Sequence, residues 1–225
     1  MKTAILISGE FRSGLYCFPS IKKHILDKVG DYDIYAALML DGDAADVSVY
    51  QPKAKKFLEQ PTLPEKNYIH RTGRQVYGVQ GVLRQLWGLK QAYKLLEESG
   101  VAYDWVMRLR ADTQFFTDIE TPLSERPDLS ERSEGVHIPT FHNWWGYNDR
   151  FAYMPSYHAK GYFCRLDNLD EYVAQGGIFH PETHLKWTMG REGIPVYRTF
   201  VEFDTVRKDG SRFPPERYFA CGDIL

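Results

Sequence analysis

Residues 106–116 read VMRLRADTQFF, an apolar run that carries two arginines and ends in an aspartate. With the preceding YDW it predicts a buried strand over residues 103–109, which is followed directly by Arg110 and Asp112. Open α/β folds bind their ligands at the carboxyl edge of a mainly parallel sheet. The stretch therefore predicts an α/β fold with a ligand site at the end of this strand.

The segments before this strand complete a β-α-β pattern. TAILISG at residues 3–9 and YDIYAALML at residues 32–40 are apolar runs typical of buried strands. Between them, helical spacing predicts a helix over residues 20–30, with Ser20 as its N-cap. A longer helix is predicted over residues 79–98, where apolar positions trace one face. We therefore expect a mixed, mainly parallel sheet flanked by helices.

The rest of the chain carries weaker signals. Residues 51–78 contain three prolines and no sustained period, which predicts a loop with one short helix around Lys53–Leu58. The pattern further on predicts a strand at 136–140, helices at 168–175 and 181–193, and a strand at 194–203. No stretch is a strong linker, so residues 1–225 are expected to form a single domain.

Composition narrows the function classes. The 225 residues carry a formal net charge of -2, which argues against a broad phosphate-binding surface and hence against nucleic-acid partners. The three cysteines are widely spaced and odd in number, which favours reduced thiols over a disulfide framework. The first apolar run is too short for a signal peptide or a membrane span. We therefore expect a cytoplasmic protein without a membrane span.

The order of these elements, with an aspartate after the strand, resembles the GT-A-type glycosyltransferases. Their metal motif is Asp-x-Asp at this place, whereas residues 110–112 read RAD, with arginine in place of the first acid. The resemblance implies a GT-A-like fold with a nucleotide-binding half (1–116) and an acceptor-binding half (117–225). It also implies sugar transfer from a nucleoside diphosphate, UDP being the commonest in this fold, to a carbohydrate hydroxyl.

Departure of a diphosphate requires neutralisation of its charge by a divalent cation, by arginine or by both. We expect Asp112 to hold Mn²⁺ or Mg²⁺, while Arg108 or Arg110 meets a phosphate or orients Asp112. The alternative is a plain Arg–Asp ion pair that caps the strand end. A literal Asp-x-Asp at residues 41–43 reads as a turn signature or as a second, less favoured metal motif.

Two further segments are candidates for binding the donor phosphates. SGEFRSG, directly after the first predicted strand, supplies Gly9 for close approach and Arg12 as a bidentate donor. IHRTGRQ supplies Arg71 and Arg74, either as a second phosphate clamp or as part of a solvated basic loop.

The catalytic candidates lie in the second half. PETHLKWTMGREG resembles the helix that opens with the catalytic acid in inverting members, which places Glu182 as the base; the alternative is a helix-dipole cap. Asp149 is the second candidate for the base. His184 is the candidate metal ligand, because retaining members use a late histidine. WWGYNDR supplies the candidate sugar contacts Trp144, Trp145, Asn148 and Arg150.

Two other functions remain open at this point. A sugar-1-phosphate nucleotidyltransferase would use a similar half-sheet and metal, but needs a fuller glycine-rich signature than SGEFRSG. A non-catalytic carbohydrate-binding protein would use the tryptophans and acidic residues to hold a glycan without a nucleotide.

Overall fold

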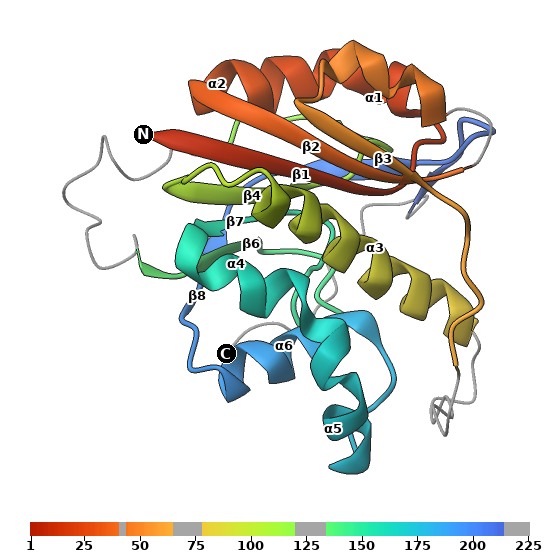
Figure 1. Ribbon diagram of the computed structural model, residues 1–225, viewed down its shortest axis with the longest axis vertical. Helices are drawn as coiled ribbons and strands as arrows, with labels where there is room; N and C mark the ends of the chain where they lie inside the picture. Colours follow the sequence, from red (N-terminus) through yellow and green to blue (C-terminus); the bar gives the residue numbers. More distant parts are fainter. Residues whose placement is uncertain (41–43, 65–77, 120–133, 214–225) are drawn as a thin grey trace.

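A seven-stranded sheet in the order β3-β2-β1-β4-β7-β6-β8 lies at the centre of the computed structural model, which describes residues 1–40, 44–64, 78–119 and 134–213 (Figure 1). The strands of this sheet are β1 (Lys2–Glu10), β2 (Asp31–Met39), β3 (Ala54–Leu58), β4 (Trp105–Leu109), β6 (Val136–Pro139), β7 (Ala152–Pro155) and β8 (Val196–Thr199). The α-helices are α1 (Gly14–Ile21), α2 (Asp27–Val29), α3 (Val79–Glu98), α4 (Ser156–Phe163), α5 (Leu169–Ala174) and α6 (Pro181–Arg191). β7 is antiparallel to its neighbours and the other pairs are parallel, so the prediction of a mixed, mainly parallel sheet is confirmed.

The strand order reverses beside β1. The chain moves outward from β1 through β2 to β3, then returns through α3 to place β4 on the other side of β1. In open α/β sheets the crevice outside the carboxyl ends of the strands at such a reversal binds ligands. The ends of β1 and β4 are therefore where the fold favours a site.

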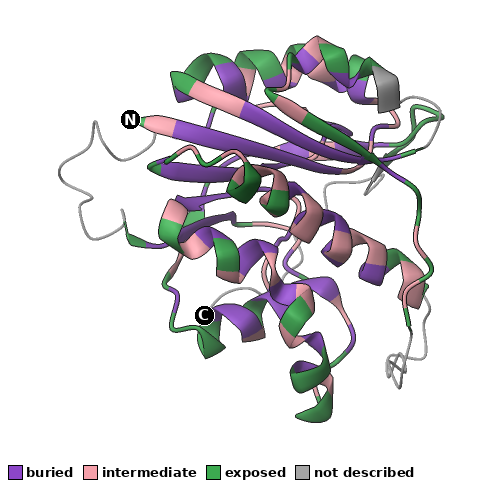
Figure 2. Ribbon diagram, viewed as in Figure 1, coloured by how far each residue is buried: buried purple, intermediate pink, exposed green. Residues whose placement is uncertain are grey.

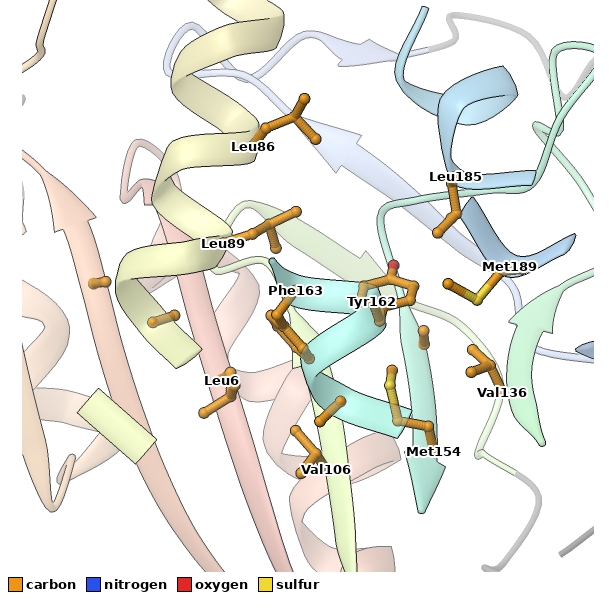
Figure 3. Close-up of a cluster of buried hydrophobic side chains, with 14 of the residues drawn as sticks. Leu6, Leu86, Leu89, Val106, Val136, Met154, Tyr162, Phe163, Leu185 and Met189 are labelled. Atoms are coloured by element: carbon orange, nitrogen blue, oxygen red, sulfur yellow. The ribbon is translucent and has the colours of Figure 1, made fainter. Parts of the chain in front are cut away.

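Alternate residues of the central strands pack on opposite faces of the sheet. Leu6 and Val106 join the core under α3, α4 and α6, where Leu86, Phe163 and Met189 converge (Figure 3). Figure 1 shows α1 and α2 on the opposite face. There the intervening strand residues, including Ile5, Ile7 and Met107, join a second core. Both cores exclude water from the sheet, and Figure 2 shows its strands largely buried between helices whose outer faces are exposed.

The first helix differs from its predicted bounds. α1 already begins at Gly14 and contains Pro19, and it continues through a π-helical turn, η1 (Lys22–Leu26), into α2. The predicted N-cap is wrong, because Ser20 lies inside the helix and its hydroxyl donates to the carbonyl of Cys17 at 2.8 Å. The helical spacing identified the buried face but not the first turn.

The short helix predicted around Lys53–Leu58 is also wrong. Residues 54–58 form β3, which pairs in parallel with residues 35–39 of β2. Lys55 and Lys56 are exposed on this edge strand, and charged side chains on an edge strand oppose pairing with another chain. The pairing partner of β3 lies earlier in the chain, so the local pattern carries little sign of it.

A smaller sheet lies beside the end of β4. It contains β5 (Thr113–Phe115), β9 (Phe203–Val206) and β10 (Arg212–Phe213), with β9 in the middle. The strand predicted over 194–203 is found only in its middle, as β8 at Val196–Thr199, and its last residue already begins β9 of the smaller sheet. The amide of Val206 donates to the carbonyl of Asp112 at 2.8 Å, which fixes the turn that follows β4.

The two predicted halves of the chain share the main sheet. β7 belongs to the second half and pairs directly with β4 of the first, from Trp105 opposite Pro155 to Arg108 opposite Ala152. None of the helices in the described ranges has the length and apolarity needed to cross a membrane.

Candidate functional site

A cavity of about 560 Å³ opens at the carboxyl ends of β1 and β4, where the strand order reverses. This volume falls within the range of small-molecule sites. Six arginines and three carboxyl groups line the cavity: Arg12, Arg84, Arg108, Arg110, Arg150, Arg207, Glu10, Asp149 and Glu182. Such an excess of cationic over anionic side chains favours an anionic ligand. We call this the arginine-lined cavity.

Strand alternation brings Arg108 to the cavity. Two residues after the buried Val106, Arg108 lies on the sheet face that α3 covers, and its side chain is almost fully buried. Its Nε donates to the carbonyl of Asp149, while Nη1 has no hydrogen-bond partner among the described residues. Burial lowers the pKa of Arg108 to about 10, so the side chain remains cationic at neutral pH.

Arg110 also lines the cavity, but it is tied to Asp112. Its Nε and Nη2 donate to the two carboxylate oxygens of Asp112 at 2.8 and 2.7 Å, and Nη1 of Arg12 lies 3.6 Å from the same carboxylate. Burial lowers the pKa of Arg110, but the charge and hydrogen bonds of Asp112 outweigh it and raise that pKa above its usual value. Asp112 itself is buried and does not belong to the cavity lining. The ion pair left open as an alternative is therefore the arrangement found.

The last residues of β1 and the turn after it contribute the expected glycine and arginine. Gly9 lines the cavity in a left-handed conformation, with φ of 112°, which a residue without Cβ adopts at little cost. Arg12 also lines the cavity and contacts the carboxylate of Glu10. Arg71 and Arg74 lie outside the described residues, as does the Asp-Gly-Asp motif at 41–43.

Asp149 lines the cavity, and its carboxylate is contacted by two side chains, buried Arg165 and partly buried Gln85. Nη2 of Arg165 lies 3.3 Å from Oδ2, and the side-chain amide of Gln85 donates to the same oxygen. Arg165 is fully buried and also donates to the carbonyl of Tyr162. Because these donors and Arg108 surround Asp149, its side chain is better placed to support the cavity wall than to abstract a proton.

Glu182 is the less encumbered carboxyl group. It lies in the first turn of α6, lines the cavity and is 5% exposed. Its Oε2 lies 3.1 Å from Nδ1 of His180, yet no described residue gives that oxygen a well-aligned hydrogen bond. Burial first, and the nearby charge of Asp149 second, raise the pKa of Glu182 to about 8. A buried carboxyl with such a pKa can exchange a proton with a hydroxyl near neutral pH.

Of the four sugar contacts predicted in residues 144–150, only Arg150 lines the cavity. Trp145 is 79% exposed, Trp144 is partly exposed, and neither is among the residues that line the cavity. Asn148 is fully buried and donates to the carbonyl of Phe141 at 2.8 Å, so it holds the loop together and is not placed to bind a sugar. The amide of Arg150 donates to the Asn148 side chain at 2.9 Å, and Arg150 does line the cavity.

Gly146 packs against the backbone of Glu182. The amide of Tyr147 donates to the backbone carbonyl of Glu182 at 3.0 Å, and a Cβ on Gly146 would lie 2.0 Å from that carbonyl oxygen. Gly146→Ala is therefore expected to lower the free energy of unfolding by roughly 1–3 kcal/mol, because backbone on both sides must shift. Urea denaturation measures this change.

Gly190→Ala is the matched control for this substitution. Gly190 lies in the last turn of α6, and an added Cβ meets no atom within 4 Å. Alanine there is expected to be neutral or to stabilise the protein by up to about 1 kcal/mol. A Gly146→Ala variant as stable as the Gly190→Ala variant would contradict the close contact with Glu182.

The structure does not bring together the two residues predicted to bind a metal. His184 is buried on α6, where its Nε2 donates to Asn168 at 2.7 Å beside the rings of Tyr172 and Trp187. Burial lowers the pKa of His184 to about 3, so it is a neutral core histidine. Asp112, in turn, faces Arg110.

A hard divalent cation requires several oxygen ligands. Within the described ranges, no three His, Cys, Asp or Glu side chains are grouped closely enough to hold an ion. The donor groups present here therefore do not fit the predicted Mn²⁺ or Mg²⁺ site.

Several lining residues were not predicted from the sequence. Arg84 and Gln85 enter the cavity from the N-terminal half of α3, and Arg207 follows β9. The only sequence signal for Arg84 and Gln85 is their place in the first half of a helix that leads to a central strand, and this signal for a ligand site is weak. Arg207 and the buried Arg165 carry no local signal, because strands and helices far apart in sequence bring them near the site.

Comparison with known proteins places the chain in a family. No curated protein matches the sequence. Residues 1–221 match a family described as a domain of unknown function, DUF7796. This match covers nearly the whole chain, including every residue that lines the arginine-lined cavity. The protein is therefore a member of the DUF7796 family.

Proposed function

We propose that the protein is a GT-A-type glycosyltransferase that transfers a sugar from a nucleoside diphosphate, UDP first among the candidates, to a carbohydrate hydroxyl. The observation that carries the proposal is the composition of one cavity: buried Arg108 and partly buried Arg110 at the end of β4, and the buried carboxyl of Glu182 at the start of α6. Anion binding and proton transfer are the two tasks that this reaction requires at adjacent places.

The mechanism follows from these groups. Arg108 and Arg110 bind the diphosphate and stabilise the negative charge that grows on it as the bond to the sugar breaks. Glu182, in its ionised form, removes the proton of the attacking hydroxyl, which then displaces the diphosphate from the anomeric carbon. A single displacement of this kind inverts the configuration of that carbon. Asp149 supports the site from behind, through its contacts with Arg165 and Gln85.

The exposed tryptophans suit the acceptor. Trp144 and Trp145 are exposed and directly precede Gly146, whose backbone packs against the backbone of Glu182, the proposed base. Aromatic faces bind sugar rings by stacking. In the proposal they hold the acceptor glycan while its hydroxyl enters the cavity.

Titration calorimetry with UDP, followed by the other nucleoside diphosphates, tests the proposal. We expect micromolar affinity for at least one diphosphate, and uridine should bind at least roughly 100-fold more weakly than UDP, because it lacks the charge-assisted contacts to arginine. Arg84→Gln, which removes a cation from the cavity wall, should weaken binding, whereas Arg191→Gln at the exposed end of α6 should not. Failure of every nucleoside diphosphate to bind would contradict the proposal.

A further inference from the structure

The charge that a diphosphate would meet in this cavity comes from arginine side chains. The lining contains twice as many guanidinium groups as carboxyl groups. Arginine offers planar pairs of N–H donors that match phosphate oxygens and keeps its charge at all physiological pH values. The wall can therefore neutralise a ligand with two or three negative charges without a further ion.

Asp112, the residue predicted to bind a divalent cation, is already paired with Arg110. Both of its oxygens accept hydrogen bonds from Arg110, and its side chain is 1% exposed. A cation bound there would have to displace a bidentate ion pair from a buried position, at the cost of leaving Arg110 without its partner. The bonds from Nε and Nη2 instead fix the plane of the Arg110 guanidinium at the cavity wall. Asp112 is thus a positioning residue for Arg110.

Arg108, unlike Arg110, has no hydrogen bond to a carboxylate among the described residues. It is a buried cation whose described hydrogen bond goes to a backbone carbonyl, and its Nη1 has no partner among the described residues. Burying a charge is costly unless it is paired and hydrogen-bonded, so an anionic ligand in the cavity would relieve part of that cost. Arg108 and Arg110 are two residues apart across the end of β4, and both line the cavity.

We infer that the cavity binds the diphosphate of its ligand without a divalent cation, with the guanidinium groups of Arg108 and Arg110 in the place of the metal and Asp112 as the residue that orients Arg110. The inference rests on the proposed function and narrows it to a metal-independent enzyme. It also assigns Asp112 a role different from the metal ligation predicted from the sequence.

The test is titration calorimetry of the full chain with inorganic pyrophosphate and, separately, with UDP, each in excess EDTA and in Mn²⁺. For the wild-type protein we expect both ligands to bind in EDTA, with dissociation constants within about threefold of those measured in Mn²⁺ after correction for Mn²⁺ bound by the free ligand. This comparison requires no variant and does not depend on the folding of a mutant.

A double-mutant cycle tests the roles of the two residues at the end of β4. Arg110→Gln is expected to weaken pyrophosphate binding in EDTA by roughly 10- to 100-fold, since a charge-assisted contact is lost. Asp112→Asn, which keeps one acceptor oxygen, should weaken it less than Asp112→Ala. Asp112→Ala should add little further loss in the Arg110→Gln background, because its effect passes through Arg110. Thermal melting checks that each variant is folded.

The outcomes separate this inference from the proposed function. Binding of UDP that requires Mn²⁺ and is lost in EDTA would overturn metal independence while leaving a transferase in place. Binding of pyrophosphate in EDTA without binding of any nucleotide would support the arginine anion site and contradict the proposed transfer of sugar from a nucleoside diphosphate. Absence of pyrophosphate binding in both conditions, or additive losses in the double-mutant cycle, would overturn the inference.

Discussion

Glu182→Gln is expected to lower the turnover number of sugar transfer by roughly 10²- to 10⁴-fold, the usual contribution of a positioned general base. Glutamine keeps the size of the side chain in its buried place but cannot accept the proton of the acceptor hydroxyl. The measurement is the rate of nucleoside diphosphate release in the presence of acceptor, with sugar conjugates of the nucleoside diphosphate that binds in calorimetry as donors. Affinity for the nucleoside diphosphate should be unchanged or slightly tighter, because a nearby acidic group is removed.

The pH profile gives this prediction a second, independent readout. The pKa of Glu182 is raised to about 8, so the ionised form that acts as a base accumulates as pH rises towards 8. Under the proposed function, kcat/KM of the wild-type protein should therefore increase with pH and level off above about 8, whereas the residual activity of Glu182→Gln should lack this rise.

Glu192→Gln is the matched control for Glu182→Gln. The same change is made just after α6, where Glu192 pairs with Arg191 on the exposed surface and does not line the cavity. It should leave both rate and pH profile unchanged. A Glu182→Gln variant with more than about a tenth of wild-type activity would exclude Glu182 as the base and turn attention to Asp149.

Arg165→Met is expected to lower the free energy of unfolding by roughly 3 kcal/mol, the lower end of the cost of breaking a buried ion pair. The substitution keeps most of the apolar stem but removes the guanidinium that lies 3.3 Å from the buried carboxylate of Asp149. The lower end applies because Gln85 still donates to Asp149 and Arg108 remains close by. Urea denaturation at pH 7 measures the loss.

Two further variants isolate the cause of that loss. Asp149→Asn in the Arg165→Met background should restore part of the stability, since the unpaired charge itself is removed. Arg191→Met removes an exposed arginine that contacts Glu171 at 2.8 Å, and should change stability by less than about 1 kcal/mol. Equal losses for Arg165→Met and Arg191→Met would show that the buried pair contributes nothing beyond a surface contact.

The parts of the fold that could be predicted are those with a strong local period. The apolar runs of β1, β2 and β4 and the helical face of α3 were predicted from sequence and confirmed. The place where β4 delivers Arg108 and Arg110 also followed, because a strand period of two puts both on one side. Glu182 at the start of α6 belongs to the same class, since a proline and an acidic residue mark a helix N-terminus.

The parts that could not be predicted depend on partners far away in the sequence. Asp112 could bind a metal ion or pair with arginine. One of the guanidinium groups near its carboxylate belongs to Arg12, which lies 100 positions earlier in the sequence. Likewise, Asn148 looks like a sugar ligand within WWGYNDR, but its amide is used by the carbonyl of Phe141. β3 is a strand because it pairs with β2, and the segment after Asp112 forms β5, which pairs with β9 outside the main sheet. No local period records such pairings.

The ladder between β4 and β7 has a consequence for how a ligand enters. The main sheet runs unbroken from β3 to β8 across both halves of the chain, so within the described residues its strands offer no hinge about which one half could rotate against the other. Any closure over a ligand is therefore expected to involve side chains and segments outside the sheet. The spacing between the arginines on β4 and the carboxyl on α6 is built in before any ligand arrives, so the site should select ligands by fit rather than reshape itself around them.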